Sequence, residues 1–259
     1  MRRMIARAVA LTFCLSAPIA HAQSLDATDP AELERAVVAS AHVGDRALAT
    51  ALASRIERGL PAPLLLRAVD ALVSNGSPPA TSALLDLATH RRAAVRAYVA
   101  RGLARSRNPS ARPVLADLLD DPDGAVRSAA ALALGELGAQ GVLDTVMLAA
   151  LRGVAEAAFL FGKQAGPMDV ARLLRQLDAG ALEAMAPALR ILLERPQVPR
   201  PTKLAIVRRL TEFPGALSER LLREVGATMV ETDPVRQAID QALTVGAPSA
   251  PSAPSGGTR

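Results

Sequence analysis

The sequence predicts an all-α protein, a solenoid of stacked helix pairs, and two observations carry that prediction. Half of the 259 residues are hydrophobic, yet aromatic residues make up only 2% and there is no Trp. The core must therefore be built from Ala, Leu and Val, of which Ala and Leu are strong helix formers. The second observation is an internal repeat, which indicates an array of similar helical units.

The repeat has a period of 31 residues. With this shift Leu72 aligns with Leu103 and then with Leu134, and the pair Val95-Arg96 aligns with Val126-Arg127. After Leu134 the register slips, although the alternation of short helices and breaks continues to the end of the apolar region. Each unit is expected to be two short helices, joined at corners that Pro, Gly or Asn marks.

The helix-forming segments have the faces that a stack requires. One pair is expected at Ala111 to Leu119 and Ala125 to Leu137, where apolar residues recur at helical spacing. The helix expected at Arg92 to Arg105 has a large apolar face and, nearly opposite, a second face of alanines. A helix with two packable faces lies between two neighbours, as in a stacked array.

The two ends of the chain differ from this pattern. Residues 1–22 are predicted to be a signal peptide, because three arginines precede the apolar stretch 8–19 and the small-residue cleavage site AHA ends at Ala22. We expect this segment to direct export to the periplasm or out of the cell, with cleavage after Ala22. The solenoid domain is expected at 23–245, followed by a disordered tail at 246–259 that is rich in Pro, Ser, Gly and Ala.

Removal of the signal peptide changes what the charge implies. Without Arg2, Arg3 and Arg7 the formal net charge falls from +5 to +2, so the basic character of the whole chain does not indicate a nucleic-acid partner. Cys14, the only cysteine, leaves with the same segment, which excludes disulfides and thiol chemistry from the mature chain. No later segment is long and apolar enough for a membrane span.

The stretch LLDDPDGAVRSAAALALGELG, residues 118–138, carries Asp120, Asp121 and Asp123 in a short acidic cluster. A calcium loop is one interpretation, but the later bidentate glutamate of such a loop is missing. A helix corner is the favoured interpretation. Pro122 stops the first helix, and Asp123 is placed to cap the amides of the second.

This stretch closely resembles the HEAT-like repeat of the bilin-lyase type, and the resemblance covers about residues 61–141. It implies a right-handed α-solenoid of about six or seven repeats. In this family an aspartate at the corner and an arginine six residues later commonly form a ladder between stacked units. Asp121 and Arg127 match that motif. One unit earlier the equivalent pair is His90 and Arg96, so an incomplete ladder is expected.

The sequence offers little for catalysis, and we expect no enzyme activity, no metal and no cofactor. The mature chain has two histidines, and neither lies in a metal-ligand pattern. Deoxyhypusine hydroxylase resembles this architecture and has paired His-Glu iron ligands, but here His42 is followed by Val43 and His90 by Arg91. No Ser-His-Asp motif and no glycine-rich phosphate loop is present.

The segment 87–116 contains seven arginines and no acidic residue. Within it Tyr98, Arg101 and Arg105 share one edge of a helix, and they are the candidate partner-binding residues. The alternative is that these arginines are the solvated flanks of a packed helix. One repeat further on, the same edge carries a more apolar strip, which favours an acidic amphipathic peptide as the ligand: Ala129, Leu132 and Glu136.

These observations together favour an exported scaffold or adaptor that binds another protein. The alternative is an envelope protein that binds an anionic glycan, lipid or acidic peptide through the arginine stripe. An enzyme with an unrecognised site is a more distant alternative. Nucleic acid is not expected as a partner, because export separates the chain from it.

Export makes a direct prediction for the N-terminus. We expect the protein purified from its native host to begin at Gln23, because AHA precedes that residue. N-terminal sequencing checks this. Intact Met1 on cytoplasmic protein would contradict export, and a lipid on Cys14 would replace it with a membrane anchor.

Overall fold

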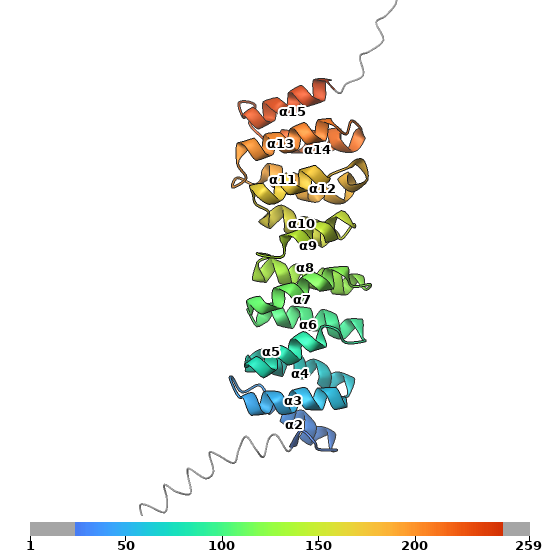
Figure 1. The fold of residues 1–259 in the computed structure, drawn as a ribbon, viewed down its shortest axis with the longest axis vertical. Helices are drawn as coiled ribbons and strands as arrows, with labels where there is room; N and C mark the ends of the chain where they lie inside the picture. The colour runs from blue at the N-terminus through green and yellow to red at the C-terminus, as the bar shows by residue number, and fades with distance from the viewer. Residues whose placement is uncertain (1–23, 246–259) are drawn as a thin grey trace, which may run out of the picture. The chain divides into compact units, whose positions relative to one another are not determined.

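The computed structural model describes residues 24–245. The predicted signal peptide at 1–22 and the predicted tail at 246–259 lie outside the described residues. Within 24–245 every regular element is a helix, and fourteen α-helices follow one another with short connections (Figure 1). The prediction of an all-α solenoid is confirmed.

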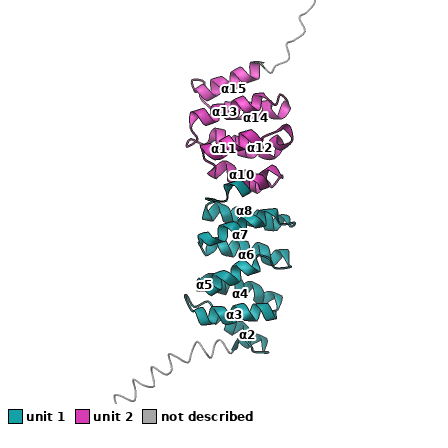
Figure 2. Cartoon of the chain, viewed as in Figure 1, with its two compact units in different colours: residues 1–145 teal, residues 146–259 magenta. Residues whose placement is uncertain are grey.

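Two compact units make up the chain, one ending at Thr145 and one beginning at Val146 (Figure 2). The helices of the first unit are α2 Pro30–Ala39, α3 Arg46–Arg58, α4 Ala62–Asn75, α5 Pro78–Leu87, α6 Ala93–Arg105, α7 Arg112–Asp117 and α8 Gly124–Leu137. Helix α9, Leu143–Leu151, spans the boundary. The helices of the second unit are α10 Ala155–Gln164, α11 Pro167–Gln176, α12 Ala179–Glu194, α13 Arg200–Thr211, α14 Ala216–Ala227 and α15 Pro234–Val245.

Within each unit the helices stack in two layers. In unit 1, α2, α4, α6 and α8 form one layer in which each helix contacts the next, while α3 and α5 contact each other in the second layer. In unit 2, α10, α12 and α14 form one layer and α11, α13 and α15 form the other. This alternation is the stacked helix-pair arrangement that the repeat predicts. The handedness of the solenoid and the domain limits 23 and 245 stay predictions.

Helix α6 shows how the stack buries two faces of one helix. Val99 and Leu103 are fully buried, and Ala97 and Ala104 on the other face are 4% and 5% exposed. Gly102 lies against α4, since a Cβ at this position would be 3.0 Å from the side chain of Val73. The two-faced pattern therefore predicted correctly that α6 lies between neighbours, here α4 and α8.

The helix expected at Ala111 to Leu119 is less regular than predicted. It divides into a 3₁₀ turn at Pro109–Ala111, helix α7 and a second 3₁₀ turn at Leu118–Asp120. Pro113 has no backbone N–H donor, which interrupts the continuous hydrogen-bond pattern of an α-helix after the turn at Pro109–Ala111. Leu118 and Leu119 still lie in the core.

Asn75, the last residue of α4, holds the connection between α2 and α3. Its fully buried side-chain amide donates to the carbonyl oxygens of Ser40, His42 and Asp45 at 3.0, 2.8 and 3.0 Å. Its Oδ1 accepts from the backbone N–H of Ser77 at 3.2 Å. One side chain thus satisfies backbone groups of two connections at once. The sequence marks this position only as a helix break.

Replacing Asn75 with Ala should therefore destabilise the protein by about 3 kcal/mol, because it removes the shared donor of three carbonyl oxygens, one in a buried bond and two in partly buried bonds. Urea unfolding measures the change. The matched control is Asn108→Ala, which removes a single cap bond to the backbone N–H of Ser110 and should cost about 1 kcal/mol. Equal losses of stability in the two variants would show that the three bonds of Asn75 stabilise the protein no more than one cap bond does.

Candidate functional site

The acidic corner at Asp121 is the polar link between two stacked helix pairs. The carboxylate of Asp121 accepts two bonds from the guanidinium of Arg96, at 2.7 and 2.8 Å. Arg96 belongs to α6, and Asp121 precedes α8. The side chains are only 14% and 6% exposed, so water competes weakly for this pair. The guanidinium lowers the pKa of Asp121, and the same bond raises the pKa of Arg96.

The Asp121 carboxylate does not pair with Arg127 of its own corner. Arg127 instead donates to the backbone carbonyl oxygens of Asp121 and Pro122, at 2.8 and 3.0 Å. The reason is geometric: the Arg96 guanidinium already takes both carboxylate oxygens, and Arg127 lies beside the carbonyl groups of its own corner. The ladder rung therefore joins Arg96 of one unit to Asp121 of the next.

The preceding corner repeats this pattern without the carboxylate. Arg96 donates to the carbonyl oxygen of His90 at 2.8 Å, as Arg127 does at its own corner. The Nδ1 atom of His90 accepts from the backbone N–H of Arg92 at 3.1 Å. Asp121 makes the same local bond to the N–H of Asp123 at 2.9 Å. His90 thus replaces the local role of the aspartate but not its ion pair, as the incomplete ladder predicts.

Asp123 caps α8, as the sequence predicts. Its Oδ1 accepts from the backbone N–H of Ala125 at 2.8 Å, and its extended backbone begins the helix. Asp121 and Asp123 thus direct their carboxylates at groups of the protein itself. Across residues 24–245, no group of three or more His, Cys, Asp or Glu side chains is placed to hold a metal ion.

The predicted partner-binding edge of α6 is partly occupied by the protein itself. The hydroxyl of Tyr98 donates to one carboxylate oxygen of Asp70 at 2.8 Å, and Arg105 donates to the other at 2.8 Å. The Arg105 guanidinium also lies 5.8 Å from the centre of the Tyr98 ring. The bond to the Asp70 carboxylate raises the pKa of Tyr98. Asp70 lies on α4, so this cluster also links two stacked helices.

Arg101 differs from its two neighbours. It is exposed, and no hydrogen bond or ion pair of its side chain occurs within residues 24–245. One repeat further on, Leu132 of α8 is 64% exposed and Glu136 is exposed too. Ala129, which the sequence places on the same strip, is only 4% exposed because it packs in the core.

Two hollows flank these residues. Arg105, Arg107 and Glu136 line a hollow of about 590 Å³ at the ends of α6 and α8. A smaller hollow of about 300 Å³ lies between α2 and α4, with Val38 and Asp70 in its lining. Val38 is 57% exposed. We call this surface the Arg101 face, defined by one set of residues: Val38, Asp70, Tyr98, Arg101, Arg105, Leu132 and Glu136.

The acid-free arginine segment is less basic in the structure than in the sequence. Arg96 and Arg105 bind Asp121 and Asp70, which both lie outside the segment. Arg112 donates to the carbonyl oxygens of Leu137 and Gly138 at 3.0 and 2.9 Å and so caps the end of α8. The sequence pattern does not single out Asp70 as a site residue, although the 31-residue shift aligns it with Arg101.

The arrangement suits recognition. Arg101 offers a guanidinium that binds carboxylates bidentately. Leu132 offers exposed apolar surface one repeat further on, and Val38 offers it beside Asp70. Within the described part of the chain, no helix is long and apolar enough to cross a membrane.

Comparison with known proteins agrees with the repeat. A family model described as HEAT repeats matches residues 81–158. The structure of the complex of CpcE and CpcF of phycocyanin lyase from Nostoc sp. PCC7120 is similar over 89% of this chain and 94% of that chain, with 18% identity and a TM-score of 0.44. An engineered protein is similar over 87% of this chain and 94% of that chain, with 18% identity and a TM-score of 0.30. No curated protein matches the chain.

The ladder rung makes a prediction about stability. Asp121→Asn should lower the free energy of unfolding by about 3 kcal/mol at pH 7, because it leaves the Arg96 guanidinium largely buried without its counter-charge. Asp123→Ala is the matched control and should cost about 1 kcal/mol, the value of a helix cap. Urea unfolding measures both. Equal costs would contradict the rung.

The lowered pKa of Asp121 adds a pH dependence. The unfolded chain holds a proton on this carboxyl group at higher pH than the folded chain does, so the stabilisation is complete above the unfolded pKa near 3.8 and is lost as pH falls through the folded pKa. The stability difference between the wild type and Asp121→Asn should therefore shrink between pH 5 and pH 2. A difference that stays constant over this range would contradict the assignment.

Proposed function

We propose that this chain, which is a HEAT-like repeat protein, is an exported, non-catalytic adaptor that binds another protein through the Arg101 face of unit 1. The observation that carries the proposal is the contrast within one helix edge. Asp70 holds Tyr98 and Arg105, whereas Arg101 and the apolar Leu132 nearby are exposed. The bonds of Asp70 hold the surface in place, while the Arg101 guanidinium and apolar side chains remain exposed to a partner.

A protein partner fits this surface better than a uniform polyanion. A polyanion binds through many free cations, but Asp70 offsets Arg105 and the hollow beside it also contains Glu136. Leu132 and Val38 add apolar area, which protein interfaces use at their centres. The partner we infer is therefore an acidic amphipathic segment, with a carboxylate for Arg101 and apolar side chains for Leu132.

Export remains part of this proposal. Its support is the three arginines, the apolar stretch and the AHA site of residues 1–22. An exported adaptor meets its partner in the periplasm or outside the cell, so envelope extract is the material in which to search for it.

Arg101→Glu should weaken capture of the partner about tenfold or more, because it replaces an attractive charge by a repulsive one at the interface. The test is a pull-down from envelope extract, followed by affinity measurement with the retained protein once it is identified. The melting temperature should stay unchanged, since the Arg101 side chain makes no hydrogen bond or ion pair among the described residues 24–245. Arg105 is unsuitable for this test because a carboxylate there would repel Asp70.

Arg92→Glu is the charge-matched control, on an exposed residue at the start of α6 and away from the Arg101 face. A second pair separates apolar contact from charge. Leu132→Ser should weaken capture, whereas Val43→Ser, at an 87% exposed position in unit 1, should not.

If Arg101→Glu and Arg92→Glu weaken capture equally, the loss of binding comes from the change in net charge. That result would support the anionic-ligand alternative.

A further inference from the structure

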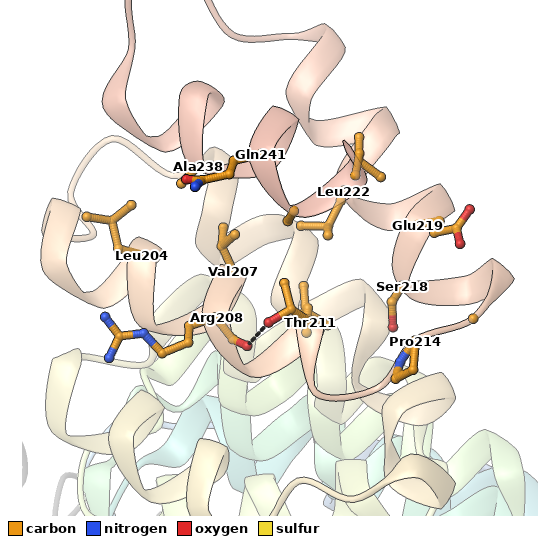
Figure 3. Close-up of a pocket in the computed structure, with 14 residues that line it drawn as sticks. Leu204, Val207, Arg208, Thr211, Pro214, Ser218, Glu219, Leu222, Ala238 and Gln241 are labelled. Carbon is orange, nitrogen blue, oxygen red and sulfur yellow. Dashed lines mark hydrogen bonds between the residues drawn. The ribbon is translucent and has the colours of Figure 1, made fainter. Parts of the chain in front are cut away.

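Unit 2 contains a cleft that the proposed adaptor role does not use. It lies where α13, α14 and α15 meet and has a volume of about 580 Å³. Figure 3 shows Leu204 and Val207 of α13 facing Ala238 of α15 across it, with Leu222 at its side. Clefts of this size are typical of small-molecule sites.

The way in which α15 packs explains why the space is open. Val235 and Ile239 are 2% and 0% exposed and hold the first half of this helix in the core. Arg236 also donates to the carbonyl oxygen of Gly226 at the end of α14. On another side of α15, Ala238 and Ala242 line the cleft, and their short side chains leave the space in front of α13 unfilled.

The walls of the cleft are mainly aliphatic, with the side-chain amide of Gln241 among them. Two hydroxyl groups line it, but both donate to the backbone of their own region. Thr211 donates to the carbonyl oxygen of Arg208 at 2.6 Å, and Ser218 donates to that of Phe213 at 2.7 Å. The hydroxyl protons are therefore not available to a ligand. The remaining walls are mainly aliphatic side chains from all three helices, which favour an apolar ligand body.

The charges at the edge of the cleft favour an anion. Glu219 accepts from Arg223 at 3.1 Å and is thereby offset. Arg208 lines the cleft and is exposed, and its guanidinium has no bond to any other residue in the range 24–245. The one charge at this edge that the protein leaves without a partner is therefore positive.

The occupant must also be small. On the side of α15 away from the core, Gln237, Asp240 and Thr244 are exposed, so this surface is polar. A further stacked helix pair or a second copy of the chain would need an apolar surface there.

We propose that this cleft binds a small amphiphile with an apolar body and a single anionic group. The body lies against the aliphatic side chains of α13, α14 and α15, and the anion pairs with Arg208.

Isothermal titration calorimetry of the full chain with dodecanoate, kept below its micelle concentration, tests the proposal. Dodecanoate should bind one per chain, and dodecanol and dodecyltrimethylammonium should bind about tenfold more weakly because they lack the anion. Arg208→Gln should weaken dodecanoate binding by a similar factor. Arg200→Gln should not, because this exposed arginine lies on the same helix but does not line the cleft.

The double variant Ala238→Leu with Ala242→Leu fills the cleft and should abolish binding, while circular dichroism and the melting temperature confirm that it folds. Absence of dodecanoate binding, or equal binding of all three amphiphiles, would overturn the proposal. A variant that ends at Val245 tests whether the C-terminal segment of the chain itself occupies the cleft. If it binds dodecanoate at least tenfold more tightly and a peptide of residues 246–259 competes, the C-terminal segment is the occupant and the proposal is wrong.

Discussion

Within each unit, a helix pair buries its apolar surface by stacking on the next pair, and the polar links between pairs fix that stacking. Helix α6 shows both parts of the constraint. Its two faces are buried against α4 and α8, while Arg96 reaches forward to Asp121 and Arg105 reaches back to Asp70. Apolar contact alone would allow neighbouring helices to slide. Directional bonds between charged groups favour one register over the others.

The same constraint determines what the surface can bind. A stack of short helices exposes many helix ends, and arginine satisfies their carbonyl groups while its aliphatic part covers apolar area. Arg112 does this for α8 in unit 1, and Arg195 does it for the carbonyl oxygens of Gly162 and Ala165 in unit 2. Much of the basic composition is therefore structural, whereas Arg101, like Arg208 in unit 2, has no such role within residues 24–245.

The features that could be predicted from the sequence are those that depend on the repeat or on a single corner. The period of 31 residues and the two apolar faces of α6 predict the stacked helices. The cap by Asp123 depends only on its own corner, so local sequence identifies it. The Arg96–Asp121 and Asp70–Tyr98 bonds join residues in different repeats, and only a comparison across repeats points to them. The cleft at Ala238 depends on how α15 packs, which no local pattern encodes.

The most direct measurement is the reactivity of individual arginines in the folded chain toward phenylglyoxal, followed by peptide mass spectrometry. The account predicts that Arg101 reacts as fast as Arg92 and much faster than Arg96 and Arg112, because the latter two guanidinium groups are held by other parts of the protein. Addition of the purified partner should then protect Arg101 and leave Arg92 reactive. Equal rates for all four arginines, or protection of Arg92 in place of Arg101, would contradict the account.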